Sequence, residues 1–237
     1  MLQHNVAYFR CTSCGFICTE EPYWLEAAYS AAITGSDLGL VNRNIHLSKI
    51  TKSVISVFFT KNRRFIDYAG GYGLFVRLMR DLGFDFHWYD KYCRNLFACH
   101  FESAENDTAY ELLTAFEVFE HLVDPINEVE KMLTYSRNIL FTTEIVPVPA
   151  PKPDEWWYYG VEHGQHISFF TVQSLELIAR KFSLNFVSDG RYCHLFTEKK
   201  IPRFFFRMVT CFRAAFIFDV LFSRKSLLPT DYLNIAK

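Results

Sequence analysis

The sequence lacks both a hydrophobic run long enough to cross a bilayer and an N-terminal targeting signal. No stretch of ~18 apolar residues occurs, and residues 1–5 have neither a basic start nor an apolar core. Positive charge is not in excess, because 25 Lys and Arg balance 26 Asp and Glu to a net charge of −1 without a basic block suited to a phosphate backbone. We therefore expect a cytoplasmic protein that does not bind nucleic acid.

The cysteine pattern does not suggest a disulfide framework. The seven cysteines are odd in number and scattered, which fits reduced thiols better than paired ones. Aromatic residues, by contrast, are abundant, with 25 Phe and 13 Tyr in a chain of 237 residues that is 50% hydrophobic. This composition is sufficient for one α/β domain with appendages. We expect most of the rings to fill its core and some to line a substrate cleft.

A strand, a glycine turn, a helix and a second strand follow one another in the first half of the chain. The first strand ends near Asp67, and the glycines at Gly70, Gly71 and Gly73 allow positive φ and close approach of the backbone to a ligand. The second strand places Asp90 at the same edge of a parallel sheet, where a carboxylate can accept both hydroxyl protons of a ribose. The pattern predicts a pocket for an adenosine-containing ligand.

Two ligand families share this arrangement, and the glycine spacing separates them. Residues 70–75 do not complete the dinucleotide fingerprint G-x-G-x-x-G. The string from Asp67 to Gly73, D-x-A-G-G-x-G, resembles motif I of the class I S-adenosylmethionine-dependent methyltransferases, with Ala69 in place of the first glycine. Ala69 fits this turn if its φ is negative.

The resemblance extends to later segments. Residues 110–125 look like the fourth strand and following turn of the small-molecule members of this family, with the string E-x-x-E-H-x-x-D-P from Glu117 to Pro125. The segment 164–171, followed by Ser174 and Leu175, resembles the entry to the family's penultimate helix. Together these segments cover roughly residues 60 to 200 in the family's order.

The resemblance implies an α/β fold with a Rossmann-like, doubly wound, seven-stranded sheet that is mostly parallel and ends in an antiparallel hairpin. Alternating strand and helix patterns favour the same core. The expected strands are 64–69, 84–90, a short one near 98–101, 111–116, 138–146, 185–189 and 192–199. The expected helices are 22–29, 44–59, 74–82, 125–135 and 171–182. The expected domains are a leader with a helical cap (1–58), the cofactor-binding domain (59–200) and a C-terminal aromatic and basic helix with its tail (201–237).

The resemblance also implies roles at the methyl donor. The glycine turn would hold its methionine moiety, Asp67 would orient the turn or the amine, and Asp90 would bind the ribose. Residues beyond the strand ends would border the adenine and the sulfonium, with Asp107 a further candidate at the adenine amine. The expected cofactor-binding residues are Asp67, Ala69, Gly70, Gly71, Gly73, Asp90, Lys91, Tyr92, Phe116 and Glu117.

In methyl transfer the donor already carries the driving force, so the protein has to hold the acceptor close and remove its proton. This requires a proton acceptor near the substrate. His166 and His163 follow a loop in the region where the family places acceptor contacts, and a histidine titrates near working pH, so they are the expected catalytic residues. The alternative for His166 is a structural hydrogen bond. Glu120 and His121 are expected to fix the start of the helix beyond the fourth strand. The aromatic run 156–159 suggests a sugar-like acceptor, with a lid that excludes water as the alternative.

The leader contains a Cys-x-x-Cys-Gly string that resembles a zinc knuckle. Cys11, Cys14 and Cys18 supply three thiols, and His4 is the remaining local candidate for a fourth ligand. Some sugar methyltransferases carry an N-terminal zinc module. Because no second Cys-x-x-Cys follows, the sequence favours a turn that holds reduced cysteines, and we expect no metal other than this possible zinc.

The C-terminal stretch 203–224 has the pattern of an aromatic and basic helix. We expect it to pack on its own domain or on a second subunit in an oligomer, with a membrane surface as the alternative. The sequence as a whole predicts an S-adenosylmethionine-dependent methyltransferase that acts on a small molecule, such as a sugar or glycan precursor. A nicotinamide-dependent oxidoreductase and a catalytically silent cofactor-binding partner protein are the alternatives.

Overall fold

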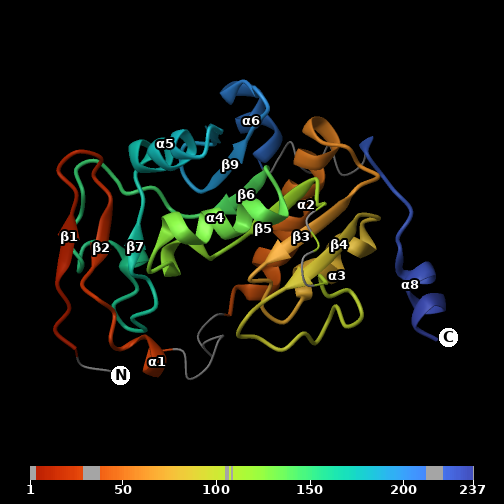
Figure 1. The fold of residues 1–237 in the computed structure, drawn as a ribbon, viewed down its shortest axis with the longest axis horizontal. Coiled ribbons are helices and arrows are strands. Elements are labelled where there is room, and N and C mark those ends of the chain that lie inside the picture. The colour runs from red at the N-terminus through yellow and green to blue at the C-terminus, as the bar shows by residue number, and fades with distance from the viewer. Residues whose placement is uncertain (1–3, 29–37, 105–106, 108, 212–220, 237) are drawn as a thin grey trace.

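A six-stranded sheet forms the centre of the protein (Figure 1), whose computed structural model describes residues 4–28, 38–104, 107, 109–211 and 221–236. Its strands lie in the order β4-β3-β5-β6-β9-β8. They are β3 Arg64–Tyr68, β4 Asp85–Tyr89, β5 Leu112–Ala115, β6 Ile139–Thr142, β8 Asn185–Ser188 and β9 Cys193–Thr197. Parallel pairing joins β4, β3, β5 and β6, and β9 runs antiparallel to both β6 and β8. The predicted mostly parallel sheet with an antiparallel terminal hairpin is confirmed.

A seventh strand was predicted near residues 98–101, but these residues, which the structure describes, form no strand. The prediction is wrong. In that region Trp88 pairs with Glu102 through an isolated bridge only. The side chain of Asn95 closes a turn there, because its amide group bonds both the N–H and the carbonyl of Ala98 at 2.9 and 2.7 Å. A side chain that bonds the backbone in this way competes with sheet pairing.

Alternating side chains of the strands pack on opposite faces of the sheet. Phe65 and Leu112 belong to one buried cluster, whereas Ile66 and Leu113, the next residues, belong to the other. This period of two is expected for strands covered on both faces. Helices α2 (Leu40–Phe58), α3 (Leu74–Asp81) and α6 (Arg203–Thr210) cover the first face, and α4 (Pro125–Tyr135) and α5 (Val172–Lys181) cover the second (Figure 1).

The two helices of the second face begin where the sequence predicts them, because side chains cap them. Asp124 accepts hydrogen bonds from the amides of Ile126 and Asn127, both at 3.1 Å, and Pro125 occupies the first turn of α4. Thr171 and Ser174 form a reciprocal capping box at the start of α5. Caps of this kind can be recognised from sequence alone.

A small antiparallel sheet at one end of the molecule was not predicted (Figure 1). It consists of β1 Tyr8–Arg10, β2 Ile17–Thr19 and β7 Ser168–Phe169, and the short helix α1 Leu25–Ala28 follows β2. The Cys-x-x-Cys-Gly string forms the turn between β1 and β2, where Gly15 has a φ of 75°. The N-terminal segment is therefore joined to the segment that precedes α5.

The C-terminal helix is shorter than predicted within the described residues. Helix α6 ends at Thr210, and residues 212–220 of the expected helix lie outside the described part. The buried Phe206 and Val209 pack α6 on its own domain, while Phe204 is exposed. A further helix, α8 (Leu228–Ile235), was not predicted. No helix among the described residues combines the length and apolarity needed to cross a membrane.

Helix α8 is joined to helix α3 by a buried ion pair. Asp231 accepts two hydrogen bonds from the Arg80 guanidinium, at 2.7 and 2.9 Å, and lies 3.1 Å from Nη2 of Arg77. Arg80 also bonds Asp85 at 2.6 Å. Removal of Asp231 would leave the buried guanidinium of Arg80 and the half-buried one of Arg77 each without one partner.

We predict that Asp231→Ala lowers the free energy of unfolding by about 3 kcal/mol in urea denaturation, because one partner of a buried ion pair is lost. The control is Glu176→Ala, which breaks the exposed pair with Arg180 on α5 and should cost less than about 0.5 kcal/mol. Equal losses in the two variants would contradict this explanation of how α8 is attached.

Candidate functional site

The glycine turn connects β3 to α3 as the sequence predicts. The amide of Gly73 donates to the carbonyl of Gly70 at 2.9 Å, and the amide of Gly70 donates to Tyr89 at the end of β4 at 3.1 Å. Gly73 is the N-cap of α3 with a φ of 85°, and a Cβ there would lie 2.6 Å from Oδ1 of Asn95. A side chain is therefore excluded at Gly73 by both backbone conformation and space.

Ala69 differs from the expectation for this turn. Its φ is +55°, in the left-handed region, so the condition of a negative φ under which alanine fits this turn is not met. A Cβ in this conformation costs roughly 1–2 kcal/mol, which gives a physical reason for a glycine at this position in the resembling motif. The strain is retained where the strand end and the start of the helix fix the backbone on both sides.

Asp90 joins the end of β4 to the glycine turn. Its Oδ2 accepts a hydrogen bond from the amide of Gly71 at 2.9 Å, and its Oδ1 accepts from Tyr92 and Cys93 at 2.7 and 2.8 Å. The indole of Trp88 donates to the carbonyl of Gly71 at 2.9 Å. The structure thus brings Asp90 and the glycines together at the carboxyl edge of the sheet.

Asp67 lies beneath the same turn and is buried. The hydroxyl of Thr114 donates to its Oδ1 at 2.6 Å. Burial raises the pKa of Asp67 to about 7, and the nearby charge of Asp90 acts in the same direction. Near neutral pH the Asp67 carboxyl group is therefore divided between its protonated and ionised forms.

The other residues predicted to lie near the donor are found in different parts of the structure. Lys91 and Tyr92 lie beyond Asp90 on the surface, with the Lys91 ammonium 5.1 Å from the Tyr92 ring. Phe116 follows β5 and packs edge-on against Phe75 of α3 at 5.0 Å. Asp107 pairs with Arg64 at the amino end of β3, so its expected position near the adenine is wrong because this is the opposite edge of the sheet.

Glu117 is held at the carboxyl ends of β5 and β6. Its backbone has a φ of 55°, and its amide donates to Oγ1 of Thr142 at 2.8 Å. The hydroxyl of Tyr192 donates to its Oε1 at 2.6 Å, and Nε of Arg43 lies 3.6 Å from its Oε2. These contacts fix the carboxylate across the edge from the glycine turn.

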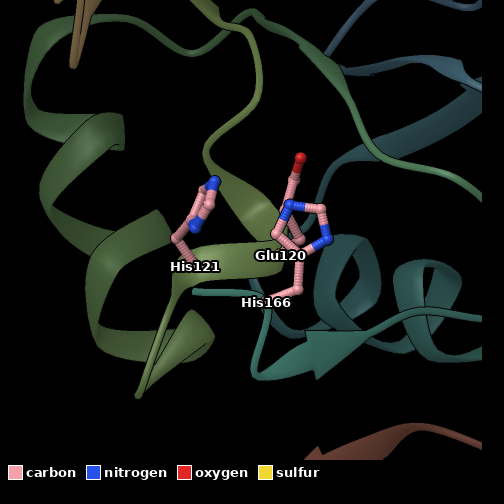
Figure 2. A group of neighbouring side chains, drawn as sticks. All are labelled: Glu120, His121 and His166. Atoms are coloured by element: carbon pink, nitrogen blue, oxygen red, sulfur yellow. The ribbon is translucent and has the colours of Figure 1, made fainter. Parts of the chain in front are cut away.

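Three titratable side chains meet just beyond Glu117. Glu120 and His121 belong to a 3₁₀ turn, Phe119–His121, and His166 comes from the segment before β7. Figure 2 shows their side chains next to one another, and one potential ligand atom from each lies within 4.8 Å of the others. The sequence assigned Glu120 and His121 to a helix start instead. The available signal was the pair of adjacent titratable residues in an otherwise apolar segment.

The two predicted catalytic histidines differ in hydrogen bonding. Nδ1 of His166 lies 2.6 Å from the carbonyl of Tyr158 and therefore carries the hydrogen, which leaves the lone pair on Nε2. Nδ1 of His163 instead accepts from the amide of Gln165 at 3.1 Å, so a neutral His163 has its hydrogen on Nε2. The structure brings the two rings to 4.9 Å from each other.

Burial lowers the pKa of both catalytic candidates. It lowers the pKa of His166 to about 3, with His121 and His163 acting in the same direction. The pKa of His163 is lowered by the same cause. The surroundings of both rings therefore favour the neutral imidazole.

The aromatic run 156–159 is mainly part of a core. Tyr158 and Tyr159 are each only 2% exposed and pack with Ile17 of β2 and Phe169 of β7. Trp157 is 72% exposed. Trp157 is thus the ring open to solvent, while the two tyrosines pack against the small antiparallel sheet.

The cysteines of the leader do not form a metal site in the described structure. Among the described residues, the one group of three neighbouring ligands is Glu120, His121 and His166, and it includes no cysteine. His4 packs against Trp24 with ring centroids 6.4 Å apart. The structure accordingly gives no support for zinc at Cys11, Cys14 and Cys18.

Comparison with known proteins adds a family to this geometry. A family model described as a methyltransferase domain matches residues 43–189, more than half of the chain. No curated protein matches the chain. Similar solved structures include TnmH (13% identity, TM-score 0.49, covering 75% of this chain and 62% of that one) and CalO1, a methyltransferase in calicheamicin biosynthesis (14%, 0.49, 75% and 60%).

A third similar structure is a possible histamine N-methyltransferase from Thermotoga maritima (11% identity, TM-score 0.41, 68% of this chain and 92% of that one). The chain spans about three fifths of the length of TnmH and CalO1.

The fold is that of a Rossmann-like α/β protein, with the glycine turn and Asp90 together at the carboxyl edge of its sheet. Since the family model covers more than half of the sequence, the chain belongs to the methyltransferase family. The predicted resemblance to class I methyltransferases is confirmed.

We predict that Gly73→Ala destabilises the protein more than Gly71→Ala. Both residues have positive φ, so alanine costs roughly 1–2 kcal/mol at either one. An added Cβ meets nothing within 4 Å at Gly71 but approaches Asn95 and Ala98 at Gly73, which adds roughly 1–3 kcal/mol of overpacking. Urea denaturation of both variants measures the difference, and equal costs would show that the packing of Asn95 against the turn is unimportant.

Proposed function

We propose that the protein transfers a methyl group from S-adenosylmethionine to a small-molecule acceptor. The observation that carries this proposal is the arrangement of Asp67, the glycine turn and Asp90, in a chain whose family is a methyltransferase family. In this proposal the unpaired amides at the start of α3 bind the methionine carboxylate, and the Asp67 carboxylate pairs with the methionine ammonium.

The ribose contact is proposed at one oxygen of Asp90. Oδ1 already accepts two backbone hydrogen bonds, whereas Oδ2 accepts one, from Gly71. A carboxylate oxygen has two lone pairs, so Oδ2 retains one for a ribose hydroxyl. Lys91 and Tyr92 are proposed to border the adenine, and Phe116 and Glu117 the sulfonium.

The acceptor is proposed to bind between Glu117 and the segment that carries His166. Of the two catalytic candidates, His166 is the better placed, because its Nε2 carries a lone pair in the neutral ring whereas Nε2 of His163 carries a hydrogen. The exposed indole of Trp157 offers a stacking face, which supports a sugar-like acceptor. Methyl transfer then needs alignment of the acceptor atom with the sulfonium and loss of its proton.

Calorimetry with S-adenosylhomocysteine and with NAD tests the cofactor assignment. We expect the former to bind and Asp90→Asn to weaken that binding about 10–100-fold, because hydrogen bonds to a charged group are lost. Glu198→Gln, which alters an exposed ion pair with Arg137, serves as the matched control and should leave the dissociation constant unchanged. Binding of NAD without S-adenosylhomocysteine would overturn the proposal in favour of an oxidoreductase.

The pKa of Asp67 predicts a pH dependence of cofactor binding. This pKa is about 7 in the unliganded protein, and the methionine ammonium requires the deprotonated carboxylate. We therefore expect the affinity for S-adenosylhomocysteine to fall about tenfold for each pH unit below 7. Isothermal titrations between pH 5 and pH 7 measure this slope.

Asp67→Asn should bind more weakly and show no such slope, because the asparagine amide does not titrate. The same slope in Asp67→Asn and in the unaltered protein would assign the titration to another group.

A further inference from the structure

We propose that Glu120, His121 and His166 bind a divalent first-row transition metal, such as Mn²⁺ or Zn²⁺, next to the methyl-donor pocket. The three side chains come from two segments far apart in the sequence and lie side by side (Figure 2). One potential ligand atom from each lies within 4.8 Å of the other two. A metal ion between them would require only small side-chain movements.

The carboxylate of Glu120 is the strongest indication of a missing cation. Glu120 has no exposed surface, and neither of its carboxyl oxygens has a hydrogen bond of normal geometry among the described residues. The nearby Tyr158 hydroxyl and the charge of Arg43 offset only part of the cost of burying it. Burying a carboxyl group without partners is costly, so such a group requires an explanation. Coordination of a cation would satisfy both oxygens at once.

Both histidines are oriented as metal ligands usually are. Nδ1 of His121 lies 3.0 Å from the carbonyl of Gln165, and Nδ1 of His166 lies 2.6 Å from that of Tyr158. A carbonyl oxygen only accepts, so the hydrogen is on Nδ1 and the lone pair is on Nε2 in each ring. Metal-binding histidines commonly donate their second ring N–H to a backbone carbonyl, which fixes the tautomer and the ring plane.

The ligand types indicate the kind of metal. Two imidazoles and one carboxylate suit Zn²⁺, Mn²⁺ or Fe²⁺ better than Mg²⁺ or Ca²⁺, which prefer oxygen ligands throughout. Three protein ligands also leave coordination positions open for water or a substrate. The negatively charged neighbour Glu117, three residues before Glu120, adds to the attraction for a cation.

The use of this metal rests on the proposed methyl transfer. The cluster begins three residues after Glu117, which borders the proposed sulfonium position. A metal at an open position would bind the acceptor hydroxyl and lower its pKa, so that its proton passes to water. With the metal bound, Nε2 of His166 is a ligand, and water replaces His166 as the proton acceptor. The acceptor oxygen then forms a bond to the methyl carbon as the carbon–sulfur bond breaks, and S-adenosylhomocysteine leaves.

Metal binding is tested on the full-length protein after treatment with EDTA and desalting. Calorimetry with MnCl₂ or ZnCl₂ alone should give one site per chain, and Glu120→Gln and His166→Ala should each weaken it at least about 100-fold. Glu120→Gln keeps the shape of the side chain, so its metal-free melting temperature should match that of the unaltered protein. The matched control is His163→Ala, whose ring lies 4.9 Å from His166 but outside the cluster, and it should bind the metal normally.

The proposal is overturned if the unaltered protein binds no metal. It is also overturned if Glu120→Gln and His166→Ala both bind the metal with unchanged affinity. Equal affinity for MgCl₂ would overturn the transition-metal assignment. Calorimetry of Glu120→Gln with S-adenosylhomocysteine should give an unchanged affinity, because the cluster does not contact the glycine turn. The two proposals therefore fail in different ways. If the cofactor assignment is wrong, the unaltered protein does not bind S-adenosylhomocysteine, whereas if only the metal proposal is wrong, that binding remains.

Discussion

The parallel pairing of β3 with its two neighbours is the constraint on which the site depends. Asp67 of β3 lies opposite Trp88 of β4 and Thr114 of β5, so the three strands end at one edge of the sheet. The residues that follow them, the glycine turn, Asp90 and Glu117, must then meet there whatever their separation in the sequence. A slip of one residue would turn every side chain to the other face and separate Asp67 from Thr114.

The parts of this fold that were predictable are those with strong local signals. The local signals are the mainly apolar strand 64–68, the caps Asp124 and Thr171, and the hairpin around Gly190. Each acts over a few residues, and the structure places these elements as expected. The juxtaposition of Asp90 with the glycines follows from the same logic, because it needs only two strands and the helix between them.

The features that were missed depend on distant contacts. Strands β1, β2 and β7 have only two or three residues each, too few for a periodic pattern, and they form by pairing residues near 17 with residues near 169. Helix α8 is fixed by a buried ion pair with Arg80, for which the local sequence carries no signal. The cluster of Glu120 with His166 likewise depends on how the intervening loop folds, and the φ of Ala69 depends on the completed turn.

Several carboxyl groups gather at the edge of the sheet, and this constrains what can bind there. Asp67, Asp90, Glu117 and Glu120 all lie along it, and two of these carboxyl groups, those of Asp67 and Glu120, are buried with their pKa values raised by burial. Such groups destabilise the empty protein when ionised, since folding removes them from water. Ligands that carry positive charge recover this energy on binding. In the proposed function the methyl donor would place an ammonium near Asp67 and a sulfonium near Glu117. Glu120 instead lies beside His121 and His166, so the proposed metal ion would be the separate cation for this second buried carboxyl group.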